Sequence, residues 1–179
     1  MQPLIVLVVV TLGLRAAGFA GVARLSSWPP AVRGGLAAMF VMTGTSHFVG
    51  MRAELISMVP PVLPEPGLLV TVTGVLELAG AVGLLVPRTV PWAAGGLAAL
   101  LVVMFPANVY AAVSGAAMEG AQTMTLLPRT LLQLLFLAAT LGVLRAYAPR
   151  RKGSVTGAAQ DDLGTRPSST VRVSSGGTH

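Results

Sequence analysis

Long apolar blocks dominate this sequence and constrain its fold more than any other feature. Each block is close to the ~20 residues that a membrane-spanning α-helix needs. Because their apolar residues run continuously, without alternating or following one helix face, they predict membrane spans rather than surface elements. The five blocks are Leu4–Val22, Ala31–Gly50, Gly67–Val86, Pro91–Val113 and Leu127–Ala146.

The composition supports an all-α, polytopic transmembrane helix bundle. Hydrophobic residues make up 54% of the chain and charged residues only 10%, outside the usual range of soluble domains. The absence of cysteine excludes disulfides and thiolate metal sites within this chain. Since the only histidines are His47 and His179, a bis-histidine haem site is hard to build. We expect no metal and no covalently bound cofactor.

The charges predict how the chain lies in the membrane. The net charge of +6 comes from residues that sit mostly at block ends and in the tail, which favours the lipid bilayer over nucleic acid as partner. The positive-inside rule then predicts a multi-pass protein of the inner (plasma) membrane, with its N-terminus outside and its C-terminus in the cytoplasm. The basic residues predicted to lie on the cytoplasmic side are Arg24, Arg33, Arg88, Arg145, Arg150, Arg151 and Lys152. The outer side has only two, Arg52 and Arg129, together with Glu54, Glu65 and Glu119.

The chain divides into three predicted parts. Residues 1–30 form an N-terminal span and turn, residues 31–148 a four-helix transmembrane domain, and residues 149–179 a disordered cytoplasmic tail rich in Ser, Thr and Gly. Should the first block not cross, the other four keep the same orientation, so the charges are compatible with four spans or five. Between the second and third blocks, MRAELISM predicts a short amphipathic helix at the outer surface, stopped by a run of prolines.

Five polar residues interrupt the apolar blocks and form the candidate site. They are His47, Glu77, Asn108, Arg129 and Gln133. Glu77 is the most unusual of the five, because it lies at the middle of the third block, and a charge at the bilayer centre costs roughly 2.5–3.5 kcal/mol on insertion scales. In the predicted orientation all five can converge in the outer half of the membrane, and a long Arg129 side chain can reach toward Glu77.

The residues around the candidate site favour close helix packing. Gly74 and Gly80 lie three residues either side of Glu77, and Gly44 lies three before His47, so neighbouring backbones can approach there. Pro106, two residues before Asn108, leaves a backbone carbonyl one turn earlier without its helical partner.

Each polar residue also has a purely structural interpretation. Asn108 and Gln133 can join helices by hydrogen bonds, and Arg129 can extend to the lipid headgroups. A paired or protonated Glu77 can likewise hold the bundle together, and His47 near the interface can be structural.

Five short motifs occur in an order and spacing that resemble the DoxX family of small bacterial membrane proteins. The motifs, GTSHF, MVPPVLP, GVLELAGAVGLLVP, FPANVY and LPRTLLQLLF, cover about Gly35 to Tyr147. The resemblance implies a bundle of about four transmembrane helices, with polar positions at the five candidate residues. The block before Gly35 is then an extra N-terminal span. Relatives in that family are linked to membrane oxidoreductase complexes and to thiol-redox homeostasis.

Three functional hypotheses follow, and the sequence leaves open whether the chain is an enzyme. The first is an accessory or quinone-handling subunit of a membrane redox system, whose electrons come from a partner oxidoreductase subunit. The second is a small-molecule or proton-coupled carrier, motivated by Glu77 and the proline in the fourth block. The third is a non-catalytic membrane assembly factor. The oligomeric state is not predicted.

Overall fold

A computed structural model describes residues 1–113 and 126–148, all within one compact unit, Met1–Ala148. These residues form helices and no strand, as predicted. The predicted disordered tail and Glu119 lie outside the described residues. The elements in order are α1 (Gln2–Phe19), the 3₁₀ turn η1 (Ala23–Leu25), α2 (Trp28–Ser46), α3 (Arg52–Ser57), α4 (Pro66–Leu85), α5 (Val90–Val113) and α6 (Leu126–Tyr147).

The five long helices coincide with the five apolar blocks to within a few residues at each end. Proline sets several of the starts, since Pro3, Pro29 and Pro66 occupy the first or second helical position. Proline has no backbone N–H, and the N–H groups of a first turn have no helical partner in any case, so its cost there is small. The residue before Pro66, Glu65, adopts a left-handed backbone with φ of 50°.

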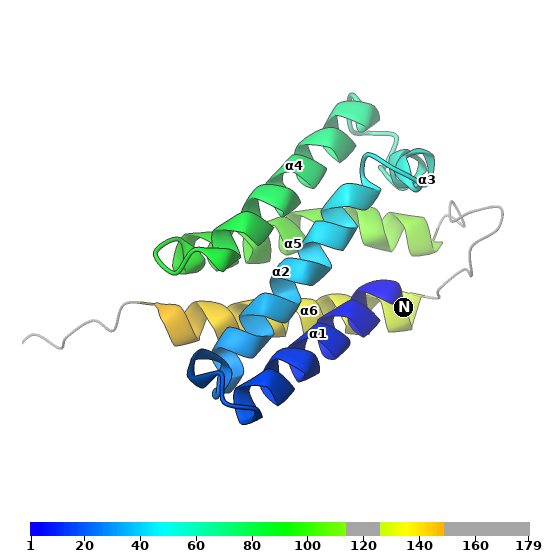
Figure 1. Cartoon of the computed structure of the whole chain (residues 1–179). Helices are drawn as coiled ribbons and strands as arrows, with labels where there is room; N and C mark the ends of the chain where they lie inside the picture. Colours follow the sequence, from blue (N-terminus) through cyan, green and yellow to red (C-terminus); the bar gives the residue numbers. More distant parts are fainter. Residues whose placement is uncertain (114–125, 149–179) are drawn as a thin grey trace, which may run out of the picture. The chain divides into compact units, whose positions relative to one another are not determined.

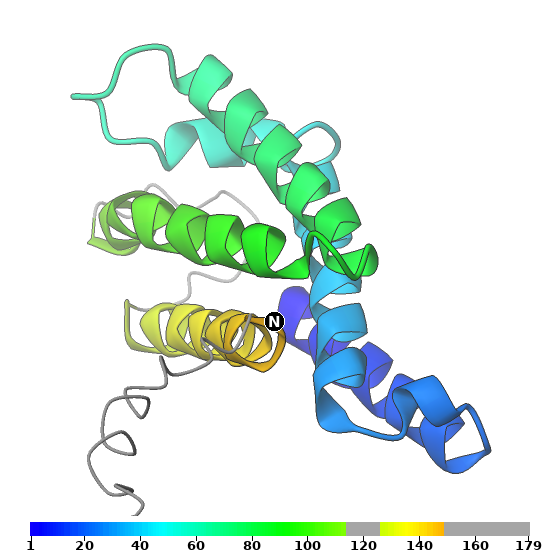
Figure 2. The ribbon, with the colours of Figure 1, turned by 90° about the vertical axis from the view of Figure 1, so that its left-hand side faces the viewer.

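The long helices are arranged in two layers. α1, α2 and α4 lie side by side in one layer, while α5 and α6 pair in a second layer behind it (Figures 1 and 2). α2 packs against α1, α4 and α6, and α4 also packs against α5. α2 is therefore the helix that joins the layers, and it has more buried residues than any other helix, including Leu36, Met39 and Phe40.

Four of the five long helices are long and apolar enough to cross a membrane: α1, α4, α5 and α6. α2, which we also predicted as a span, is less apolar because it contains Arg33 and several Gly, Thr and Ser residues. Its position explains the difference. A helix surrounded by other helices meets little lipid, so small residues that allow close packing replace large apolar ones.

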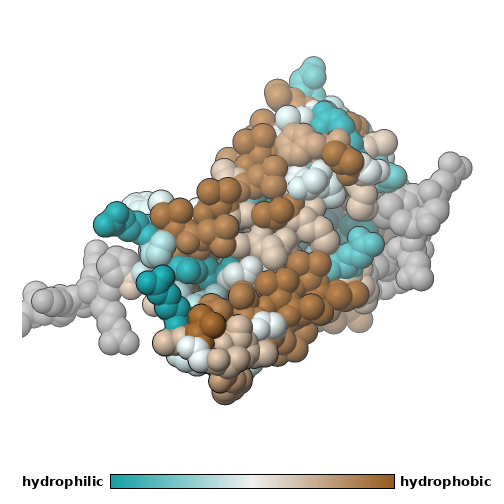
Figure 3. All heavy atoms as spheres, viewed as in Figure 1, coloured by the Kyte–Doolittle hydropathy of each residue, from teal (hydrophilic) through white to brown (hydrophobic). Residues whose placement is uncertain are grey.

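The surface of the bundle is apolar where lipid would contact it. Large hydrophobic side chains on α1, α4 and α5 are strongly exposed, for example Val9 at 62%, Val82 at 61% and Val103 at 72%. In Figure 3, which has the same view as Figure 1, apolar atoms cover the places of α1 and α4, and hydrophilic residues gather toward the ends of the helices. Such large exposed apolar areas are rare on soluble monomers and typical of a membrane or protein interface.

Candidate functional site

Glu77 and His47 lie together between α2 and α4. Both are buried, with 5% and 3% of their surface exposed. The Thr43 hydroxyl donates a hydrogen bond of 2.6 Å to Oε2 of Glu77. The carbonyl oxygen of the same threonine lies 3.0 Å from Nδ1 of His47. Since a carbonyl can only accept, Nδ1 carries the hydrogen in this bond, and Nε2 is the ring nitrogen left for a second partner.

Glycines bring the two helices close enough to form this group. A Cβ atom added at Gly74 of α4 would lie 2.5 Å from Cβ of His47, and one at Gly44 of α2 would lie 3.2 Å from Cβ of Glu77. On the other side of α4, a Cβ at Gly80 would meet the Leu97 side chain of α5 at 2.5 Å. The predicted close approach at all three glycines is confirmed.

Asn108, Arg129 and Gln133 form a second group between α5 and α6. Nδ2 of Asn108 donates to Oε1 of Gln133 over 2.5 Å, and Nη1 of Arg129 lies 3.5 Å from Oδ1 of Asn108. Gln133 is buried and its Nε2 donates to the carbonyl oxygen of Leu101. That carbonyl lies just over one turn before Pro106, so the amide of Gln133 supplies a bond across helices next to the proline position.

The structure does not bring all five candidate residues into one cluster. Within residues 1–113 and 126–148, no ion pair or hydrogen bond joins Arg129 to Glu77, so the expected reach of Arg129 is wrong. Instead Thr43 contacts Glu77, and Asn108 contacts Arg129. The rotation of each helix decides this, because Arg129 and Glu77 each face a different neighbour.

Met58 links the second group to the predicted outer helix. α3 packs on α4, and the buried Met58 that ends it places its sulfur 3.9 Å from Nη1 of Arg129. The short helix predicted from MRAELISM is present and lies against part of the site. Thioether sulfur is a weak acceptor, so this contact satisfies the guanidinium poorly.

Two residues that the sequence reasoning did not select are important here. Thr43 is the hydrogen-bond partner of Glu77, and its only sequence signal is the spacing of four residues from His47, which places both on one helix face. Arg52 donates to the carbonyl oxygens of His47 and Gly67 at 3.2 Å each and to the Thr71 hydroxyl at 3.0 Å. It thereby fixes the end of α2 against the start of α4.

The candidate residues offer hydrogen bonds and charge rather than metal ligation. The described part of the chain holds no group of three or more His, Cys, Asp or Glu side chains placed to share a metal ion. Arg129 differs from the other members, because its Nε is buried without a hydrogen-bond partner and its two Nη1 contacts are long. A buried guanidinium N–H without an acceptor is costly, so this position suits an external acceptor.

A comparison with protein families identifies the chain. It matches the family model described as "Domain of unknown function (DUF8561)" over residues 36–144. The chain belongs to the DUF8561 family. The DUF8561 match contains all five candidate residues, together with α3, α4 and α5 complete, and it begins after α1. No curated protein and no solved structure matches the chain.

Proposed function

We propose that this DUF8561 protein is a polytopic protein of a bacterial plasma membrane, with α1, α2, α4, α5 and α6 as its five spans. The support is the apolar exterior of the bundle and the length of the helices. At 1.5 Å per residue, the 19 residues of α2 extend about 28 Å, close to the ~30 Å of a hydrocarbon core. The charge distribution then puts the N-terminus outside and the C-terminus in the cytoplasm.

Single cysteines test this topology, because the chain has none of its own. An impermeant thiol reagent added to intact cells is expected to label Gln2→Cys and Val62→Cys but not Ser27→Cys, all three of which replace exposed residues. Labelling of Val62→Cys without Gln2→Cys would leave only four crossings. Labelling of Ser27→Cys alone would reverse the orientation.

Within the membrane we propose that the protein is an accessory subunit of a redox system and binds the headgroup of a quinone. The observation that carries this proposal is Arg129, a cation inside an apolar bundle with a buried Nε that has no acceptor. Quinone carbonyls accept hydrogen bonds, and a guanidinium offers five N–H donors in a fixed plane. The likeness to the DoxX family, whose members are linked to oxidoreductase complexes, supports the same class of function.

The neighbours of Arg129 fit this role. Asn108 holds the guanidinium through its Oδ1, and Gln133 holds Asn108 in turn, so the donor is oriented before a ligand arrives. Met58 contacts the guanidinium only weakly, so a carbonyl can displace it at little cost. Since the chain has no cysteine and no metal cluster among its described residues, electrons would come from a partner oxidoreductase.

A short-chain quinone analogue is expected to raise the melting temperature of the detergent-purified protein. At a ligand concentration about 100 times the Kd, the stabilisation would be about 2.7 kcal/mol. We expect the shift to vanish in Arg129→Gln and to persist in Arg145→Gln, which removes an exposed arginine from the last turn of the same helix. An equal shift in both variants would show that the analogue binds elsewhere. No shift in the wild-type protein would overturn the quinone proposal.

A second candidate, a non-catalytic assembly factor, is favoured by the way the other polar groups are satisfied. Glu77 pairs with Thr43, and Gln133 pairs with both Asn108 and the Leu101 backbone. Each of these bonds joins two different helices, as expected for residues that hold a bundle together. This function predicts that substitutions at Glu77 and Gln133 change stability and leave any quinone response unaltered.

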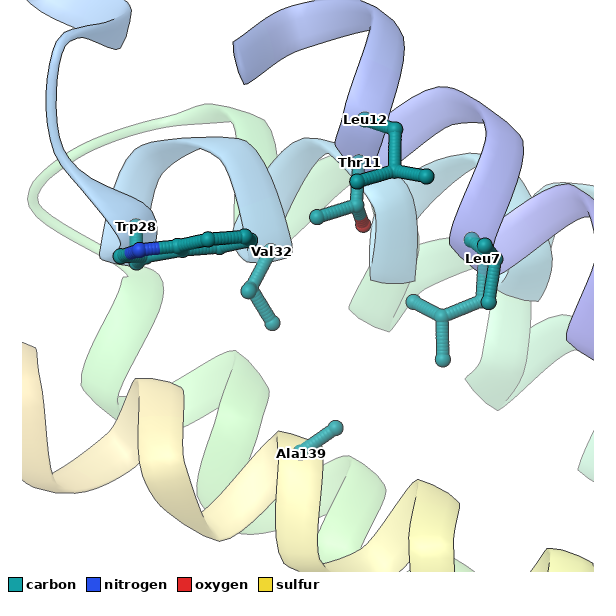
Figure 4. Close-up of a pocket in the computed structure, with 7 residues that line it drawn as sticks. Leu7, Thr11, Leu12, Trp28, Val32 and Ala139 are labelled. Atoms are coloured by element: carbon teal, nitrogen blue, oxygen red, sulfur yellow. The ribbon is translucent and has the colours of Figure 1, made fainter.

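The carrier hypothesis gains no such support. It was motivated by Glu77 and by Pro106, yet Glu77 bonds to a neighbouring helix and α5 continues through the proline. Figure 4 shows an open groove in the described structure, between α1, α2 and α6, and none of the five candidate residues lines it.

A further inference from the structure

The groove between α1, α2 and α6 is a second feature of the bundle, separate from the polar groups. It has a volume of about 230 Å³ and is open on one side. Its walls are apolar, with Leu7 and Leu12 from α1, Trp28 and Val32 from α2, and Ala139 from α6 (Figure 4). Because α1 packs chiefly on α2 and η1, the described residues leave the space between α1 and α6 unfilled.

Arginines gather at one end of this groove. The Arg15 guanidinium lies 5.1 Å from the centre of the Trp28 ring, which forms the groove wall, and donates to the carbonyl oxygen of Leu25. Arg33, next to the wall residue Val32, stacks over the Tyr147 ring of α6 at 5.2 Å. Both cations therefore lie near the start of α2, Arg15 against Trp28 and the loop after α1, and Arg33 against the end of α6.

No acidic side chain among the described residues pairs with these arginines. The sequence contains no Asp or Glu before Glu54, and no ion pair involves Arg15 or Arg33 within residues 1–113 and 126–148. Their guanidinium groups stack on aromatic rings, which leaves N–H donors at the groove end for an anion. Nε of Arg15 is buried without a hydrogen-bond partner.

We propose that the groove binds one acyl chain of an anionic phospholipid, whose phosphate is held by Arg15 and Arg33. Basic residues between spans on the cytoplasmic side are a recognised way of holding anionic lipid headgroups. A neutral ligand such as a quinone could accept hydrogen bonds from these arginines but would leave their two positive charges unbalanced, which a phosphate would not. A second copy of the chain, aligned in the same membrane direction, would bring its own arginines to the same end and repel. The proposal rests on the membrane placement above and is independent of a ligand at Arg129.

The two tryptophans make this proposal measurable. Trp28 lines the groove, whereas Trp92, at the start of α5, is 84% exposed and lies outside it. In the proposed topology both are near the cytoplasmic ends of their helices, so they sample similar depths. The Trp92→Phe variant isolates the groove tryptophan, and Trp28→Phe isolates the lipid-facing control.

The experiment compares quenching of each tryptophan by phospholipids brominated on the acyl chain. Both variants are reconstituted in phosphatidylcholine bilayers with a small fraction of brominated phosphatidylglycerol or brominated phosphatidylcholine. For Trp28 we expect the affinity for brominated phosphatidylglycerol to exceed that for brominated phosphatidylcholine by about fivefold for each arginine that contacts the phosphate. For Trp92 we expect only the weaker general attraction to a basic protein.

Substitutions then distinguish binding of the lipid headgroup from binding of its acyl chain. In the Trp92→Phe background, Arg15→Gln and Arg33→Gln are each expected to reduce the preference, and Ala139→Phe, which fills the groove, to remove it. Equal quenching of Trp28 by the two lipids would overturn the proposal in favour of bulk lipid. Absence of quenching by either lipid would also overturn it, because a protein segment would then cover the groove. The quinone response at Arg129 is measured separately, so the two proposals fail independently.

Discussion

Gly74→Ala is expected to be among the most damaging single-methyl additions in the protein. The new Cβ would lie 2.5 Å from Cβ of His47 and 2.9 Å from Cε2 of Phe48. The ring of Phe48 can turn away, but Cβ of His47 is fixed to its backbone, so α2 and α4 must move apart. Overpacking of this kind costs about 1–3 kcal/mol in the free energy of unfolding. Thermal unfolding in detergent measures it.

The matched control is Gly95→Ala on α5, where an added Cβ meets no atom within 4 Å. Alanine favours a helix over glycine, so this variant should melt at or slightly above the wild-type temperature. Gly74→Ala also separates Glu77 on α4 from the Thr43 hydroxyl on α2, so its loss should exceed the steric cost alone. Equal melting temperatures for the two variants would mean that α2 and α4 are not packed at Gly74.

The helices were predictable because their signal is local. A run of about 20 apolar residues fixes a span without reference to any neighbour. Glycine near a buried polar residue, as at Gly44 and Gly74, likewise predicts close packing whichever helix approaches. The long helices and the close packing at these glycines are confirmed, and four of the helices are long and apolar enough to cross a membrane.

The partners of the polar residues were not predictable in the same way. Which helix Arg129 faces depends on the rotation of α6 about its axis. Arg129 and Gln133 share a face of α6, but the sequence does not show which neighbouring helix that face meets. The expected contact with Glu77 was wrong for this reason. Thr43 escaped notice because threonine occurs in many spans, where its hydroxyl often bonds to its own helix.

Removing the Thr43 hydroxyl and removing the Glu77 carboxyl are expected to have unequal effects on stability. Thr43→Val keeps the shape of the side chain but removes the hydroxyl that donates to Glu77. It leaves a buried carboxyl without its hydrogen-bond donor, and leaving a buried polar group unsatisfied costs about 1–3 kcal/mol. Glu77→Leu removes the carboxyl instead, and the Thr43 hydroxyl can then bond fully to the Phe40 carbonyl oxygen, already 3.4 Å away. Thr43→Val should therefore destabilise the protein more than Glu77→Leu does.

A double-mutant cycle makes this comparison quantitative. Once Glu77 is leucine, adding Thr43→Val should cost little, because no carboxyl remains to be left unpaired. Melting of the four proteins gives the coupling free energy, and Thr45→Val is the control, since its exposed hydroxyl bonds only to the Val41 carbonyl of its own helix. If Thr43→Val costs the same with and without Glu77, the two side chains are not coupled, and Glu77 must be held in the bundle by another group.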